Sequence, residues 1–380
     1  MNEELALFRD NVRRFIAAEI APHYEQWERA GIFPRQLWNK LGQQGLLGVD
    51  LPEAYGGFGA NFLFSMAIVE EFSHANYGSI GGPMTVHSDI VAHYILNNGT
   101  EAQKQRYLPA MVAGDCVGAI AMTEPGAGSD LQAVRTTANR DGDHFILNGS
   151  KTFITNGQHC DMVIVVARTN TEVAGSRGTS LFLVDTATPG FQRGRNLEKI
   201  GLHASDTSEL FLEELRVPAS ALLGEEGRGY RVAVGELAGG RIGIGSLALG
   251  VGLAALDYAR NYLGEREQFG TRIGNFQGLQ WMLADRYTEL EAARLLLMQA
   301  AWNKEQGLDF GASAAMAKLF ASEKANEACY SALQLMGGAG YIREYPLERL
   351  ARDVRITSIY EGTSEIQRVI IARELLRDIL

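Results

Sequence analysis

The sequence predicts an α+β chain in which helical regions flank a central β region. Apolar residues recur at helical spacing from Leu5 to Ile16, and short apolar runs separated by turn signals begin near Cys116. Long alanine-rich helical patterns return after Gly227. We therefore expect a helical domain at 1–115, an antiparallel β domain at 116–225 and a helical bundle domain at 226–380.

The first region contains several further helical patterns. Apolar residues keep helical spacing from Leu37 to Leu47 and from Met66 to Phe72. Two glycine clusters, Gly56-Gly57-Phe58-Gly59 and Gly81-Gly82-Pro83, predict loops between helices. The first residues are acidic, and no basic stretch followed by an apolar core is visible, so we expect no export signal or transit peptide and a bacterial cytoplasmic location.

The middle region reads as short strands. The runs at 144–147, 162–166 and 180–184 are apolar, and Asn-Gly, Asp-Gly and Pro-Gly turns lie among them. This pattern is typical of an antiparallel sheet.

Three long helical patterns follow, at 241–263, 279–302 and 312–336. The uncharged stretch at 242–256 is shorter than a membrane span and is dense in glycine and alanine. It predicts a tightly packed buried helix, and we expect no membrane span.

Composition excludes several function classes. The 380 residues carry a net charge of −10, with a pI near 5.3, which argues against nucleic acid as the main partner. Three separated cysteines give neither a disulfide framework nor a zinc site, and the seven histidines lack metal-binding spacing. We expect no metal.

Four segments carry residues suited to ligand binding. Residues 121–130 combine glycines and hydroxyls that expose backbone N–H groups to a phosphate or a polar ring edge, although the same residues also suit a cluster of β-turns. Residues 151–157 offer an aromatic ring beside a threonine at the sheet edge, or simply a hairpin. Residues 266–270 place an arginine beside an aromatic ring at a helix end, and residues 334–341 place three glycines at another. No Gly-x-Gly-x-x-Gly follows a strand, so a nicotinamide site is unsupported.

Glu361 lies in a polar segment that interrupts the helical C-terminal region. Desolvation by Tyr360 would raise the pKa of its carboxyl towards neutrality, and Gly362 would let a ligand approach the backbone. The carboxylate could then accept a proton. On its own, the segment also fits a solvated loop carboxylate or a helix cap.

Taken together and in this order, the segments resemble the acyl-CoA dehydrogenase family. The similarity runs from Leu5 to Leu376. Residues 121–133 fit the first family signature, residues 334–353 fit the second, and residues 360–368 fit the catalytic segment.

The resemblance implies a fold, a cofactor and partners. The family fold is an N-terminal helical domain, a middle β domain and a C-terminal four-helix bundle, assembled as a homotetramer that is a dimer of dimers. FAD lies between the sheet and the bundle, the substrate is an acyl-CoA, and electron-transfer flavoprotein reoxidises the flavin.

Matching positions imply roles for individual residues. The flavin and its ribityl chain would contact Met122, Thr123, Ser129, Phe153 and Thr155, with Thr363 and Glu365 in the adjoining loop. The adenine end and pyrophosphate would be held across a subunit boundary by Arg266, Phe269, Gln277, Gln334 and Gly338. Glu361 matches the base that removes the α-proton while hydride passes from the β-carbon to flavin N5. Ser129, Arg241 and Gly362 match positions on the substrate side.

Two positions bear on the substrate. Some branched- and long-chain members carry the base immediately before the arginine, where this chain has Gly240, so Glu361 is the candidate base. Other stretches of the chain look more like the bacterial long-chain type, and chain length stays open. Ala238 stands where many members have an aspartate that contacts the pantetheine arm. This leaves open ordinary variation, with water in place of the contact, or an acyl-carrier-protein or specialised biosynthetic thioester.

Two further hypotheses keep the fold but change the role. The chain could be a flavin oxidase or monooxygenase, although such relatives commonly replace the glutamate. It could also be a non-catalytic flavin-binding or scaffold protein, against which the intact Glu361 and Arg241 argue.

Overall fold

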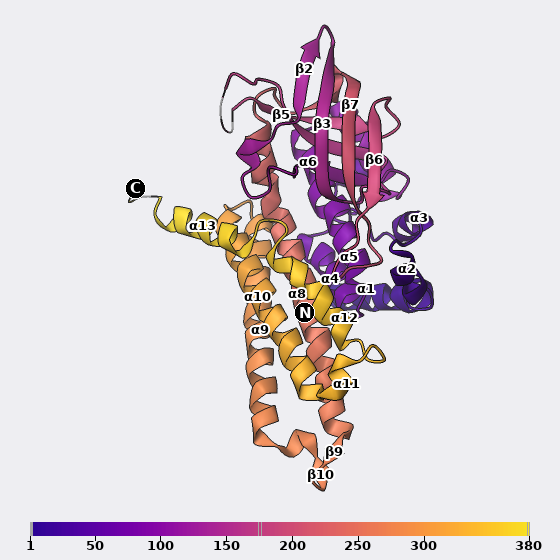
Figure 1. The fold of residues 1–380 in the computed structure, drawn as a ribbon, viewed down its shortest axis with the longest axis vertical. Helices are drawn as coiled ribbons and strands as arrows, with labels where there is room; N and C mark the ends of the chain where they lie inside the picture. The colour runs from indigo at the N-terminus through magenta and orange to yellow at the C-terminus, as the bar shows by residue number, and fades with distance from the viewer. Residues whose placement is uncertain (1–2, 174, 176, 378, 380) are drawn as a thin grey trace.

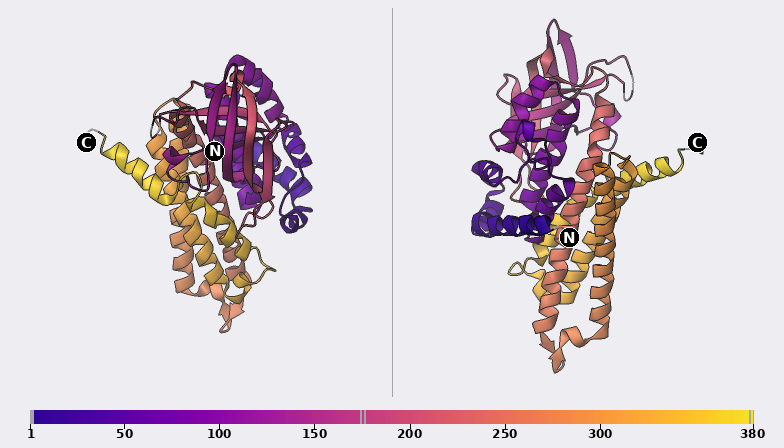
Figure 2. Two further views of the ribbon diagram at one scale, coloured as in Figure 1. Left: turned by 45° about the horizontal axis from the view of Figure 1, so that its top comes forward. Right: turned by 180° about the vertical axis from the view of Figure 1, so that it is seen from behind.

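The computed structural model describes residues 3–173, 175, 177–377 and 379. Along the chain, a group of N-terminal helices is followed by a β-sheet and then by long C-terminal helices (Figure 1). The sheet lies at one end of an elongated molecule and the helical bundle extends from it, with the N-terminal helices packed beside both (Figure 2).

The N-terminal domain is built from seven α-helices, with short π-helical segments at Ile16–Ile20 and Val86–Val91. The α-helices are α1 (Glu3–Phe15), α2 (Tyr24–Ala30), α3 (Gln36–Gln43), α4 (Phe62–His74), α5 (Gly78–Thr85), α6 (Ala92–Asn98) and α7 (Glu101–Val112). Gly56 and Gly59 both have positive φ and lie in the connection before α4, as expected of a loop.

The predicted loop at Gly81-Gly82-Pro83 is wrong, because these residues are buried inside α5. Gly82 packs against Leu247 of α8 (Gly229–Glu265), since a Cβ on Gly82 would lie 3.4 Å from that side chain. Tertiary burial outweighs the low helix propensity of the segment.

The sheet of the middle domain is mainly antiparallel and has the order β6-β7-β3-β2-β4-β5-β8. Its strands are β1 (Gly118–Ala121), β2 (Thr137–Asp141), β3 (His144–Thr155), β4 (Met162–Arg168), β5 (Thr179–Asp185), β6 (Phe191–Asn196), β7 (Thr207–Pro218) and β8 (Leu222–Leu223). Strand β1 pairs with β4 in parallel, and β2 meets β4 in parallel at one position. Strand β3 lies between β7 and β2, but β2 pairs only with residues 144–148 of β3, and residues 151–155 pair with β7. The predicted edge position of residues 151–157 stays a prediction.

The C-terminal domain is a bundle around α8 (Gly229–Glu265), α9 (Gln277–Glu305) and α10 (Gly311–Met336). The short strands β9 (Glu267–Gln268) and β10 (Thr271–Arg272) join α8 to α9 at the end farthest from the sheet (Figure 1). Helices α11 (Gly338–Tyr341), α12 (Leu347–Val354) and α13 (Ser364–Leu375) complete the domain.

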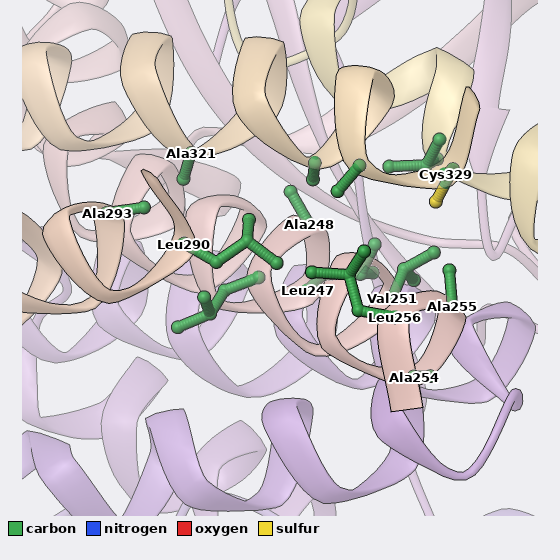
Figure 3. Close-up of a cluster of buried hydrophobic side chains, with 14 of the residues drawn as sticks. Leu247, Ala248, Val251, Ala254, Ala255, Leu256, Leu290, Ala293, Ala321 and Cys329 are labelled. Carbon is green, nitrogen blue, oxygen red and sulfur yellow. The ribbon is translucent and has the colours of Figure 1, made fainter. Parts of the chain in front are cut away.

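Small and medium apolar side chains from α8, α9 and α10 fill the core of the bundle, including Leu247, Val251, Leu290 and Ala321 (Figure 3). Alanine and glycine on facing positions allow close helix contact. Helix α8 is the one described helix long and apolar enough to cross a membrane, yet 83% of its most apolar window is buried. It is the core helix of the bundle, as the sequence predicts for 242–256.

Candidate active site

Glu361 lies in the loop between the 3-10 turn Arg355–Ser358 and α13, and its backbone is left-handed with φ of 53°. Left-handed backbone is unfavourable for a residue with a Cβ, so the surrounding structure must hold it. The amide of Gln367 donates to the carbonyl oxygens of Glu361 at 3.0 Å and Gly362 at 2.8 Å. Thr363 caps α13, since its hydroxyl accepts from the N–H of Ile366.

The carboxyl of Glu361 points into the protein. Its Oε2 is closed off from solvent and has no hydrogen-bond partner among the described residues. Desolvation raises its pKa to about 7, although the nearby cations Arg241 and Lys318 act to lower it. A carboxyl with this pKa exchanges a proton readily near neutral pH.

Gly240 on α8 faces this carboxyl directly. A Cβ at Gly240 would lie 3.1 Å from Oε2 of Glu361 and 2.8 Å from Ile90. The two positions at which a base would stand therefore converge on one point in space, and glycine at one leaves room for the carboxyl from the other.

Arg241 is next in sequence and is only 5% exposed. Burial lowers the pKa of its guanidinium, while Glu361 and Tyr94 act to raise it. Its Nε has no hydrogen-bond partner, and among the described residues it forms no ion pair with Glu361. Arg241 thus acts on Glu361 through space and keeps donor capacity free for a ligand.

The segments at residues 121–130 and 151–157 lie side by side. The N–H of Thr152 donates to the carbonyl oxygen of Thr123 at 3.0 Å, so Met122 and Thr123 lie beside the strand that carries Phe153 and Thr155. Phe153 has φ of 60° at an irregular position of β3, which turns its ring outwards to 67% exposure. Ser129 is exposed in the neighbouring loop.

A buried ion pair supports these two segments. Nζ of Lys151 donates to Glu124 at 2.8 Å and to the carbonyl oxygen of Met122 at 3.1 Å. Glu124 also accepts from the N–H groups of Arg135 and Thr136, and with Lys151 these bonds outweigh burial and lower its pKa. Sequence reasoning missed this pair, although Glu124 lies within one motif segment and Lys151 begins the other.

The remaining candidate residues lie elsewhere in the chain. Arg266 and Phe269 flank β9, and Gln277 begins α9, at the end of the bundle remote from the sheet (Figure 1). Gln334 and Gly338 lie where α10 gives way to α11. Within a single chain, these residues do not lie beside Glu361. The side chain of Phe269 is 94% exposed. Thr363 and Glu365 lie at the start of α13 itself.

The exposed surface formed by Gly126, Gly128 and Phe153 suits a planar, polar ligand. Gly126 and Gly128 are exposed, with no described atom within 4 Å of an added Cβ, so their backbone N–H groups are approachable. The ring of Phe153 is exposed, and the hydroxyl of Tyr360, the residue before Glu361, has no hydrogen-bond partner among the described residues. These residues fit a flavin, which needs an aromatic wall and hydrogen-bond donors for its polar edge.

Three family models together match nearly the whole chain. The acyl-CoA dehydrogenase N-terminal domain matches residues 2–115, the middle domain matches 119–215 and the C-terminal domain matches 227–376.

Relatives match over the full length. The long-chain specific acyl-CoA dehydrogenase, mitochondrial, of Sus scrofa is 47% identical over 99% of this chain and 87% of its own length. The acryloyl-CoA reductase (NADH) of Anaerotignum propionicum is 41% identical over 99% of this chain and 95% of its own.

Solved structures agree. The acyl-CoA dehydrogenase of Geobacillus kaustophilus superposes with a TM-score of 0.96 at 42% identity and covers 99% of this chain and 98% of its own. A chain from a study of the electron transferring flavoprotein of Acidaminococcus fermentans also has a TM-score of 0.96, at 43% identity, covering 100% and 99%. A glutaryl-CoA dehydrogenase of Mycobacterium smegmatis in complex with FADH2 has a TM-score of 0.92 at 32% identity, covering 99% and 95%.

Fold and site together define an enzyme of the oxidoreductase class. The chain belongs to the acyl-CoA dehydrogenase family. The resemblance read from the sequence and the predicted fold class are thereby confirmed, whereas the roles assigned to single residues stay predictions.

Proposed function

We propose that this protein is an FAD-dependent acyl-CoA dehydrogenase in which Glu361 removes the α-proton of the substrate. One observation carries the proposal. Glu361 presents a buried carboxyl oxygen without a partner, with a pKa of about 7, facing Gly240 of α8 and close to the cations Arg241 and Lys318. A base in this state is ready to accept a proton and is not neutralised by an ion pair.

The residues around Glu361 would bind and orient the thioester. Ser129, Arg241 and Gly362 are the proposed substrate contacts, and Arg241 brings a buried positive charge to the site. The backbone N–H of Glu361 would donate to the thioester carbonyl and stabilise the enol-like charge. One such donor is typically worth about 3 kcal/mol in the transition state.

FAD would be held by two groups of residues. Met122, Thr123, Phe153 and Thr155 come from two adjoining segments of the middle domain, and the exposed loop glycines leave the backbone open there. When bound, FAD supplies the hydride acceptor for the β-carbon. The FADH2 complex of the Mycobacterium smegmatis relative supports this cofactor.

A homotetramer would complete the cofactor site. The adenine-end candidates lie at the far end of the bundle from Glu361, so a second subunit would supply them. Trp281, Leu295 and Trp302 are each more than half exposed and recur at multiples of seven residues, which puts them on one face of α9. Such an exposed apolar face on a long helix supports assembly.

The electron acceptor and the substrate are finer proposals. The similarity to a chain studied with an electron transferring flavoprotein supports that class of acceptor. Since one relative is named a reductase, the dehydrogenating direction also belongs to the proposal. Ala238 is buried and gives no preference between CoA and a carrier protein. We further propose a cytoplasmic location and domain boundaries after residues 115 and 225.

Anaerobic addition of a panel of acyl-CoA thioesters to the holoenzyme tests the proposal. A substrate should bleach the flavin's visible absorption and yield a trans-2-enoyl thioester. If no thioester, on CoA or on carrier protein, reduces the flavin, the proposed function is wrong. Rapid peroxide formation on turnover would instead favour an oxidase.

A further inference from the structure

We propose that Lys318 is a positioning residue for the base: it ties down the loop of Glu361 and keeps the carboxyl ionised near neutral pH. The inference rests on the proposed function of Glu361. Sequence reasoning missed Lys318, because a lysine on a helix usually faces solvent.

Lys318 is fully buried, although a lysine is rarely so. Its Nζ donates to the carbonyl oxygen of Gly362 at 2.7 Å, one residue after the base. Gly245 on α8 packs against this part of α10, since a Cβ there would lie 3.6 Å from Cα of Lys318, an ordinary contact distance. Burying a charge costs free energy, so a neutral hydrogen-bond donor would be sufficient if the only role of this contact were to hold the loop in place.

A neutral donor to the same atom is already present. The amide of Gln367 reaches the Gly362 carbonyl oxygen at 2.8 Å and that of Glu361 at 3.0 Å. The backbone of the loop therefore accepts hydrogen bonds from one neutral donor, Gln367, and from one charged donor, Lys318. What Lys318 adds beyond Gln367 is its positive charge.

The position of that charge matters. Lys318 spends its described hydrogen bond on the Gly362 carbonyl and forms no ion pair with Glu361 among the described residues. A direct ion pair would occupy the carboxylate and weaken it as a base, whereas a cation held nearby favours its charged form and leaves its oxygen free. Burial in turn lowers the pKa of Lys318 to about 8.

The other titratable groups facing Glu361 are Arg241 from α8, Tyr94 from α6 and the adjacent Tyr360. Burial raises the pKa of both tyrosines, so they are neutral near pH 7. Desolvation thus disfavours the ionised form of the Glu361 carboxyl, and the two cations Arg241 and Lys318 favour it. Of these two, Lys318 is the one that is hydrogen-bonded to the loop of Glu361.

The test titrates Glu361 in the holoenzyme without substrate. Infrared difference spectra across the pH range identify its carboxyl band as the one missing from Glu361→Gln. Lys318→Met should move the midpoint of that band to higher pH, and Lys318→Arg should leave it close to the unmodified protein. With an active thioester, Lys318→Met should also reduce flavin at least about twofold more slowly at pH 7, with little loss at high pH.

Two controls separate charge from structure. Gln367→Leu removes the neutral tie to the same carbonyl and should not raise the midpoint. Lys199→Met removes another partly buried lysine, whose Nζ donates to the carbonyl oxygen of Ser205 at 2.7 Å and whose charge acts on Asp206 and Asp353. Lys199 is not among the cations that act on Glu361, so this variant should change neither the midpoint nor the rate.

An unchanged or lowered midpoint in Lys318→Met, or an equal shift in Gln367→Leu, would overturn the inference. Because the titration needs no thioester, failure of every acyl-CoA to reduce the flavin would refute the proposed function and leave this result independent.

Discussion

Moving the base from one position to the other is a demanding prediction of this structure. A Cβ at Gly240 would lie 3.1 Å from Oε2 of Glu361, so a glutamate at Gly240 could bring its carboxyl to the same region. Glu361→Gly removes the native base and relieves the left-handed backbone, because glycine adopts φ of 53° freely. Adding Gly240→Glu should then restore part of the activity.

The magnitudes follow from general base catalysis and packing. Loss of a positioned base costs about 10²–10⁴ in rate, or about 3–5 kcal/mol of transition-state stabilisation. Crowding against Ile90, 2.8 Å from the new Cβ, should lower stability by about 1–3 kcal/mol. We expect the double variant to exceed Glu361→Gly by at least about tenfold, short of the full rate.

The assay is anaerobic rapid mixing of each holoenzyme with the best thioester, following flavin absorption. Ile90→Ala in the double variant should relieve the crowding and raise the rate further. Gly240→Glu alone serves as the control, since two neighbouring carboxyls should raise each other's pKa and slow reduction at neutral pH. If the double variant retains FAD and remains as slow as Glu361→Gly, with or without Ile90→Ala, the convergence of the two positions has no catalytic meaning.

Three further predictions concern the pH dependence of flavin reduction, the stability contributed by the Lys151–Glu124 ion pair, and subunit assembly. With a pKa of about 7 for Glu361, flavin reduction should fall about tenfold from pH 8 to pH 6, because the ionised fraction falls by that factor; a flat profile over this range would contradict it. Lys151→Met should lower the free energy of unfolding by about 3–5 kcal/mol, since Glu124 is left buried and unpaired, and adding Glu124→Gln should recover part of it in denaturant titrations. Trp302→Glu should shift the mass measured by light scattering to smaller species with weaker FAD retention, and an unchanged mass would exclude this face of α9 from assembly.

Periodicity predicted the order of helical, β and helical regions because each region buries one face of its elements. It failed at Gly81-Gly82-Pro83, where glycine and proline indicate a loop unless the partner helix is known. It also did not predict the order of the strands within the sheet, since strand order depends on long-range pairing that no local pattern records.

The candidate site could be predicted from the sequence only in part, because some of its residues are recognised by a local motif and others only by tertiary packing. Glu361 stood out because its segment matches a family motif, and its raised pKa was foreseeable from the apolar neighbours. Lys318 and Gln367 were not foreseeable, because a lysine and a glutamine on helices usually face solvent. Only the packing of α10 against the loop before α13 reveals them.

Replacement of Glu361 by glutamine tests the central claim most directly. Glutamine keeps the size and cannot accept the α-proton, so Glu361→Gln should retain FAD and its assembly but reduce flavin at least about 100-fold more slowly. The measurement is the single-turnover rate of flavin reduction above pH 8, where the native carboxyl is ionised. A rate equal to that of the unmodified protein would remove Glu361 from the mechanism.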